Sequence, residues 1–217
     1  LPSPNETFVA LFELLKDETM QSEIMITLNR AMIGFGLAIL VGSILGLFAG
    51  LFITASIMSR PIVTILFGMP PIAWIVLAMI WFGMGDTTVI FTVFIASFPI
   101  VFVGALQGTR TLEGELKEMA DSFHLPFSMK LFDLYLPHIF SYIFPAYISA
   151  LGMSWKIVIM AELLATSDGL GAALAVARSQ LETSTALAIV TIMIASLLII
   201  EYVVLEPIKK ELEAWRD

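Results

Sequence analysis

Few residues of this 217-residue chain could do chemistry, and their spacing argues against catalysis. The two histidines, His124 and His138, lie 14 residues apart, which is not the spacing of a zinc-protease site. The chain has no cysteine, so disulfides and thiolate metal sites are excluded. No serine has a nearby His–Asp partner, and no phosphate-binding G-x-x-x-x-G-K-[ST] motif occurs. We therefore expect no catalytic residue, no metal site and no cofactor bound by this chain.

Lys156 is the charged residue that most needs an explanation. It lies inside an apolar stretch from about 139 to 163, where an ammonium group costs at least about 2.5 kcal/mol on insertion scales. Glu162 follows six residues later, roughly 240° around a helix, so we do not expect the two side chains to pair. Glu162 is near the outer end of the stretch, where we expect partial solvation. Two roles for Lys156 stay open: attracting an anion, or a structural role in which backbone carbonyls or another helix's acid hold it.

Prolines and glycines mark two further features. Pro70 and Pro71 interrupt an apolar stretch near its middle and free carbonyl groups that lipid cannot satisfy. The break therefore either borders a polar path or serves packing alone. Glycines also recur every four residues, at Gly42, Gly46 and Gly50, and so share one face of a helix. They either allow another helix to pack closely or form the smooth wall of a path. The candidate residues for such a polar path are Lys156, Pro70, Pro71, Trp74, Ser154 and Glu162.

Composition identifies the elements that must position these residues. Hydrophobic residues make up 59% of the chain and charged residues 14%, whereas a soluble domain carries roughly 25% charged residues. Between Ala31 and Thr109 the only charged residues are Arg60 and Asp86. A soluble enzyme, a disordered tail and a secreted disulfide scaffold are thereby excluded, and the net charge of −8 argues against nucleic-acid binding. The sequence predicts an integral protein of the lipid bilayer.

Five stretches are apolar over the roughly 20 residues that a membrane-spanning helix needs. They run from about 31–56, 61–82, 89–106, 139–163 and 186–205. Only helices fit, because barrel strands would alternate apolar and polar residues, so the fold class is an all-α membrane protein. Before the first stretch, Phe8, Leu11, Phe12 and Leu15 predict an amphipathic helix capped by Ser3 or Asn5. That helix lies either in the membrane interface or against the outer end of the bundle.

Basic residues set the expected orientation, because they accumulate on the cytoplasmic side. One side holds Lys16, Arg30 and Arg178. The other holds seven: Arg60, Arg110, Lys117, Lys130, Lys209, Lys210 and Arg216. The second side, with segment 109–137 and the C-terminus, is therefore expected to be cytoplasmic. The N-terminal segment would then lie outside, and a chain made without a signal peptide would need one more span upstream to reach that side.

The sequence of segment 109–137 predicts two short helices joined by a turn. One apolar stripe runs from Leu112 to Phe123 at helical spacing. Pro126 suits the first position of a second helix, which we expect to end at Leu136-Pro137 before the chain re-enters the membrane. Such a hairpin needs a surface to pack against, either its own bundle or a soluble partner.

The hairpin resembles the EAA loop of ABC importer permeases. The matching residues are Glu118-Met119-Ala120, then His124, Leu134, Leu136 and Pro137. Met119 replaces an alanine, and His124 replaces a glycine at the turn, where positive φ is expected; histidine adopts positive φ more often than most residues. Met69-Pro-Pro-Ile-Ala-Trp74 and Asp168-Gly-Leu-Gly171 look like the nitrate/sulfonate/taurine group of these permeases. The resemblance covers essentially the whole chain.

This resemblance implies a type I ABC importer permease fold in the inner membrane, with five of six helices visible. Residues 1–217 would form one permease domain, with 109–137 as its coupling hairpin. The implied partners are a second copy, two cytoplasmic ATPase subunits that bind ATP and Mg, and an extracytoplasmic solute-binding protein. The implied ATPase-coupling residues are Glu118, Ala120, Asp121, His124, Leu125, Pro126, Phe127, Leu136 and Pro137. A small anion such as nitrate, a sulfonate or taurine is the favoured solute; pyrimidine vitamin precursors stay open.

Two other functions compete with this one. A self-contained channel or ion-driven carrier would transport alone, but it leaves the cytoplasmic hairpin without a purpose. An intramembrane enzyme would need paired carboxylates or a Ser/His pair inside the spans, and the embedded charges Lys156 and Glu162 provide neither.

Overall fold

The structure, a computed structural model, describes residues 2–111, 122–124 and 126–205. These residues contain no β-strand, and the all-α prediction is confirmed. The α-helices are α1 (Pro4–Lys16), α2 (Glu18–Leu51), α3 (Ile53–Gly68), α4 (Pro71–Phe82), α5 (Asp86–Arg110), α7 (Phe127–Met129), α8 (Leu136–Ala165), α9 (Leu170–Ser179) and α10 (Thr183–Ile199). Two π-helical turns, η1 (Lys130–Tyr135) and η2 (Ile200–Leu205), precede α8 and follow α10.

Within the described residues, four helices are long and apolar enough to cross a membrane: Glu18–Leu51, Asp86–Arg110, Phe132–Ala165 and Thr183–Tyr202. The second apolar stretch is instead divided between α3 and α4, which count as a fifth span only when taken together. The break falls at Met69-Pro70, where both residues have extended backbone angles. The predicted interruption by Pro70 and Pro71 is therefore confirmed.

The first span begins earlier than the sequence suggested. Helix α2 starts at Glu18, not near Ala31, and its 34 residues end at Leu51. At 1.5 Å per residue it is about 51 Å long, well beyond the roughly 30 Å hydrocarbon layer. A search for apolar residues detects only the later part of this helix, from about Ala31 onward. Arg30, which the sequence placed in a loop, therefore lies inside a spanning helix.

The expected helix end at Leu136-Pro137 is wrong. The chain is helical through this point, from η1 directly into α8. Pro137 is the second residue of α8, directly after the π-helical turn η1, so its missing N–H removes one backbone hydrogen bond at the junction of the two helical segments. The second half of the hairpin is thus continuous with the fourth span.

The chain groups into two compact units. Unit 1 takes in the described parts of Leu1–Gly34, Pro70–Phe94 and Gly152–Asp217. Its core includes Ile75, Val89, Val158 and Ile189, all nearly or fully buried. Unit 2 takes in the described parts of Phe35–Met69 and Ile95–Leu151, and its core includes Ala38, Val101, Ala105 and Ala150.

Within unit 2 the glycine stripe of α2 packs against α5. A Cβ atom at Gly42 would lie 2.9 Å from the Val101 Cβ, and one at Gly46 would lie 2.7 Å from the Ala105 Cβ. Gly50 faces Thr109 in the same way. Of the two interpretations of this stripe, close helix packing is therefore the observed one.

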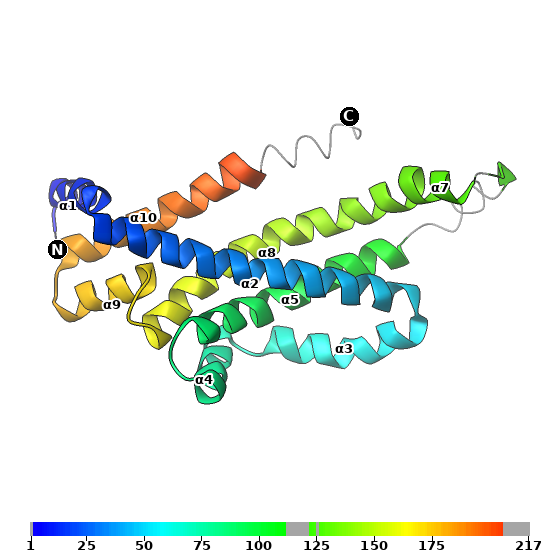
Figure 1. Ribbon diagram of the computed structural model, residues 1–217, viewed down its shortest axis with the longest axis horizontal. Coiled ribbons are helices and arrows are strands. Elements are labelled where there is room, and N and C mark those ends of the chain that lie inside the picture. Colours follow the sequence, from blue (N-terminus) through cyan, green and yellow to red (C-terminus); the bar gives the residue numbers. More distant parts are fainter. Residues whose placement is uncertain (1, 112–121, 125, 206–217) are drawn as a thin grey trace. The chain divides into compact units, whose positions relative to one another are not determined.

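Within unit 1 two short helices accompany the spanning ones. Helix α1 begins with the predicted cap, because the Ser3 hydroxyl accepts the Glu6 N–H while the Glu6 carboxylate accepts the Ser3 N–H. Helix α9 was not expected from the sequence. Both α1 and α9 lie beside α10 (Figure 1).

Candidate functional site

Arg30 is the centre of a charged cluster in unit 1. Its Nη1 atom lies 3.0 Å from Oε1 of Glu162, and its Nη2 atom lies 2.7 Å from Oδ1 of Asp168. Its Nε atom donates to Oδ1 of Asp86 at 2.8 Å, and Nη2 also pairs with that carboxylate. We call Arg30, Asp86, Glu162 and Asp168 the Arg30 cluster. One guanidinium thus joins α2, the start of α5, the end of α8 and the α8–α9 loop.

Glu162 is the fully buried member of the cluster. Its side chain has 0% exposure, against 69% for Asp86 and 48% for Asp168. Besides Arg30, it accepts the Thr27 hydroxyl at 2.8 Å and the Gly171 N–H at 3.1 Å. Such bonds are needed because an unpaired charge is very costly to bury. The expected partial solvation of Glu162 is therefore wrong.

Two glycines let the α8–α9 loop and the first turn of α9 approach this carboxylate. Gly169 has φ +95°, a conformation that favours glycine, and a Cβ atom there would overlap the Glu162 carboxylate. At Gly171 a Cβ atom would lie 2.6 Å from the Glu162 Cβ. The Leu170 N–H donates to the Thr27 hydroxyl at 2.8 Å, and the Gly169 N–H donates to Glu23. Backbone and side-chain bonds together attach this loop to α2.

The sequence drew attention to Glu162 but missed its partners. Arg30 was counted as a loop charge, and Asp86 and Asp168 were not considered as site residues. A signal was present, since Asp86 is one of the two charges between Ala31 and Thr109. The pairing itself joins residues 132 positions apart, which spacing within a helix cannot indicate.

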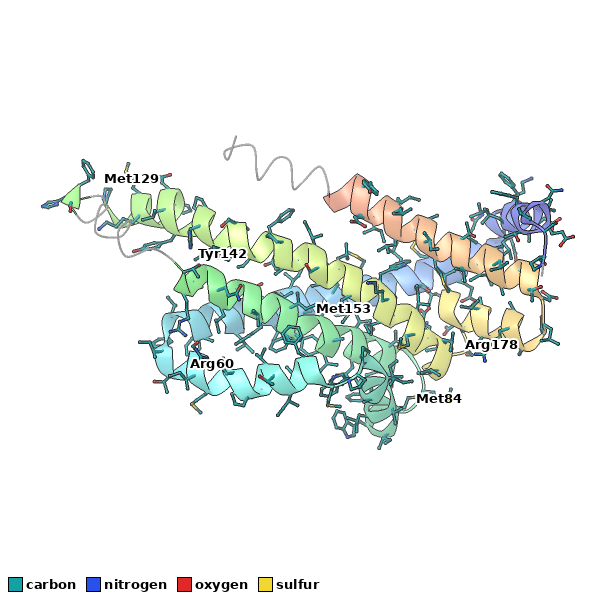
Figure 2. The ribbon with its side chains drawn as sticks, turned by 180° about the vertical axis from the view of Figure 1, so that it is seen from behind. Arg60, Met84, Met129, Tyr142, Met153 and Arg178 are labelled. Carbon is teal, nitrogen blue, oxygen red and sulfur yellow. The ribbon has the colours of Figure 1, made fainter. Side chains whose placement is uncertain are left out.

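Lys156 does not join the cluster. It is exposed on α8, three residues after Met153 (Figure 2), between the buried side chains of Trp155 and Ile157. Within the part of the chain that the structure describes, no carboxylate lies within ion-pair distance of it. As predicted, Lys156 and Glu162 do not pair.

The surface around Lys156 is open. It lies nine residues before the end of α8 at Ala165, about 14 Å along the helix. One turn before it, a Cβ atom at Gly152 would have no neighbour within 4 Å, and one turn after it Met160 is 41% exposed. An ammonium group on such a face needs water or another polar surface, because acyl chains cannot solvate it.

The other candidate path residues lie elsewhere in unit 1. Trp74 is on α4, one turn after Pro70 and Pro71, and Ser154 is buried on α8. Among the described side chains, the Trp74 indole nitrogen is the buried polar atom that has no hydrogen-bond partner. Buried N–H groups usually have an acceptor, so this donor is available to a ligand.

Part of the candidate coupling loop can be described. His124 is exposed and has φ +53°, which confirms the positive φ predicted for the residue at the glycine position of the motif. Pro126 accepts the Lys130 N–H at 3.1 Å, and Phe127 begins α7. Leu136 and Pro137 are the first residues of α8. The remaining loop residues, Glu118, Ala120, Asp121 and Leu125, lie outside the described residues.

The described residues offer groups that position the chain and groups that could bind a solute. They contain no group of three His, Cys, Asp or Glu side chains able to hold a metal ion. In the Arg30 cluster every N–H of the guanidinium has an acceptor, so the cluster holds a loop and three helices together. Lys156 and Trp74, in contrast, each present a donor that has no partner among the described residues. Unused donors of this kind suit an anion.

Comparison with known proteins identifies relatives of this chain. Residues 30–207 match the family model described as binding-protein-dependent transport system inner membrane component. The taurine transport system permease protein TauC of Escherichia coli is 29% identical over 176 residues, which cover 79% of this chain and 64% of TauC. The nitrate import permease protein NrtB of Synechocystis is 25% identical over 180 residues, covering 79% of this chain and 66% of NrtB.

A third relative is the putative aliphatic sulfonates transport permease protein SsuC of Bacillus subtilis. It is 25% identical over 171 residues, covering 79% of this chain and 62% of SsuC. The chain thus spans a little under two thirds of the length of these curated relatives.

Proposed function

Because the chain belongs to the family of binding-protein-dependent transport system inner membrane components, in its nitrate/sulfonate/taurine branch, we propose that it forms the path of an ATP-driven importer for a small anion. In this proposal two copies of the chain work with two cytoplasmic ATPase subunits, which bind ATP and Mg. An extracytoplasmic binding protein delivers the solute. Segment 109–137 and the C-terminus face the cytoplasm.

We infer that the solute is an anion chiefly from Lys156. An exposed ammonium group within a spanning helix, with no carboxylate partner among the described residues, supplies positive potential where low dielectric makes it strong. The solutes for which the relatives are named, which are taurine, aliphatic sulfonates and nitrate, are small and either are oxyanions or carry a sulfonate. The Trp74 N–H adds a donor that an oxyanion oxygen can accept. Pro70 and Pro71 lie at the start of α4, which carries Trp74, and Ser154 is on α8 with Lys156. Glu162 acts through the Arg30 cluster.

Uptake into vesicles that contain the complete transporter tests this proposal. The permease is reconstituted with its copurified ATPase and supplied with binding protein and labelled taurine, alkanesulfonate or nitrate. Lys156→Met should slow uptake, while Lys156→Arg should largely retain it because the charge is kept. Lys16→Met, which changes an exposed lysine on α1, is the matched control. Unchanged uptake by Lys156→Met would remove the anion role, and uptake without ATP would identify a channel or carrier instead.

The coupling part of the proposal concerns segment 109–137. By resemblance, the turn from His124 to Phe127 enters a groove on the ATPase, and Glu118 anchors the loop. The double change Glu118→Ala with Phe127→Ala should abolish solute-stimulated ATP hydrolysis and loosen the ATPase in detergent. Ser128→Ala, at an exposed neighbouring position, should do neither. If the permease itself loses thermal stability while the ATPase stays bound, the segment is a scaffold and not a coupler.

A further inference from the structure

Helix α1 presents three different faces around its axis. Phe8, Phe12 and Leu15 are 60%, 63% and 44% exposed and fall within about 60° of one another at 100° per residue. We call these three residues the aromatic face. Leu11 and Leu14 are less exposed and lie to one side of it, consistent with α1 packing beside α10.

The third face of α1 is acidic. Glu6 and Glu13 are exposed and lie about 140–160° around the helix from Phe8. One face of α1 packs on protein, and the other two are open. The open apolar face is best solvated by a nonpolar medium, whereas the open acidic face needs water. The boundary between acyl chains and water provides both.

The connection to α2 holds α1 at the level of that boundary. Asp17 is the one residue between α1 and α2, and its carboxylate accepts the Thr19 N–H at 3.0 Å, so the link is short and ordered. Helix α2 is membrane-spanning by length and composition. Its first turns contain Glu18 and Glu23, whereas its apolar part follows later. Helix α1 therefore lies where the chain leaves the bilayer, and the Ser3–Glu6 capping box fixes its other end.

We propose that α1 lies in the membrane interface, with the aromatic face in the acyl chains and Glu6 and Glu13 in water. The partner of this face is lipid, recognised by apolar area and not by charge. Many interfacial helices carry lysine or arginine on the polar side and bind anionic headgroups. In α1 the side opposite the aromatic face carries Glu6 and Glu13, and the one basic residue of the helix is Lys16 in its last turn, so insertion does not depend on anionic lipid.

Spin labelling tests this placement in the assembled transporter, and the sequence has no native cysteine to interfere. Single cysteines replace Phe8, Phe12 and Leu15, with Glu6 and Glu13 as controls on the same helix, and each carries a nitroxide. The proteins are reconstituted in vesicles of phosphatidylcholine, with and without phosphatidylglycerol. Collision rates with oxygen, which concentrates in lipid, and with a water-soluble nickel complex give a depth parameter.

The depth parameter should be positive at Phe8, Phe12 and Leu15 and negative at Glu6 and Glu13, in both lipid compositions. Low collision rates with both reagents on the aromatic face would mean that protein covers it, from a second copy or another subunit, and would overturn the proposal. Equal nickel accessibility at Phe12 and Glu13 would place the helix in water. Positive values only with phosphatidylglycerol present would contradict recognition by apolar area. Uptake by the Glu13 variant shows separately whether the labelled transporter still works.

Discussion

Arg30 and Glu162 stand 132 residues apart in the sequence and form a buried ion pair, with Nη1 and Oε1 3.0 Å apart. Their side chains are 5% and 0% exposed. Buried pairs of this kind recover the cost of removing two charges from water only when further hydrogen bonds complete them. Thr27, Asp168 and the Gly171 N–H provide those bonds here.

Removing the guanidinium should therefore be strongly destabilising. Arg30→Gln leaves Glu162 as a buried carboxylate without its cation, and breaking a buried pair costs about 3–5 kcal/mol. We expect a large drop in the thermal unfolding midpoint of the detergent-purified permease, followed by intrinsic tryptophan fluorescence. Asp86→Asn is the matched control, because the Asp86 side chain is 69% exposed and leaves no buried charge unpaired when it is replaced, so we expect a smaller loss. Equal losses in the two variants would contradict the assignment of Glu162 as the dominant partner.

Replacing both buried charges should cost much less than the two single changes suggest. In the double variant Arg30→Met with Glu162→Met, no buried charge remains unpaired, and well-packed apolar replacements of buried pairs are often neutral. A double-mutant cycle on unfolding midpoints should show favourable coupling of about 0.5–3 kcal/mol. Additive losses would mean that the two residues stabilise the protein independently.

Features that depend on neighbouring residues could be predicted from the sequence, whereas the start of α2 could not. Five apolar stretches and the break at Pro70 followed from hydropathy and proline chemistry, because both depend on neighbouring residues. The positive φ at His124 followed from the glycine that the motif has there. The start of α2 did not follow, since its first turns carry Glu18, Glu23 and Arg30, which read as loop residues when considered by type alone.

Long-range partners were beyond the reach of one sequence. Lys156 was expected not to pair with Glu162 because helix geometry places them apart, and this was confirmed. The true partner of Glu162 lies on another helix, and no rule of spacing connects residues 30 and 162. Helix α9 was missed for a different reason: its ten residues from Leu170 to Ser179 are too short to stand out as a span.

Glycine at position 171, in the first turn of α9, should be required for this turn to pack against α8. In Gly171→Ala the new Cβ atom would meet the Glu162 Cβ at 2.6 Å and the Leu163 backbone nitrogen at 2.8 Å, and neither helical atom can move freely. Overpacking of this kind costs about 1–3 kcal/mol, so the unfolding midpoint should fall. Gly68→Ala is the control, since a Cβ atom there would have no neighbour within 4 Å. A midpoint for Gly171→Ala that matches the control would show that this turn does not pack on Glu162 as described.

Side-specific labelling should show the two ends of α8 on opposite sides of the membrane. Ser128 precedes this span and Ser167 follows it, and both are exposed. Removing the buried Arg30 from the loop charges leaves seven basic residues on the side of Ser128 against two on the side of Ser167, which strengthens the expected orientation. In a chain without native cysteines, Ser128→Cys should react with an impermeant maleimide only in inverted vesicles, and Ser167→Cys only in intact cells.

The paired design separates an inverted orientation from a wrong span. Reaction of Ser128→Cys only in intact cells, with Ser167→Cys reacting only in inverted vesicles, would keep α8 as a span but reverse the topology. The loop that resembles a coupling hairpin would then face away from any cytoplasmic ATPase, and the coupling proposal would fail with it. Reaction of both from one side would mean that α8 does not cross the bilayer. Lys156 would then have no membrane-embedded position, and its proposed role with an anion would have to be abandoned.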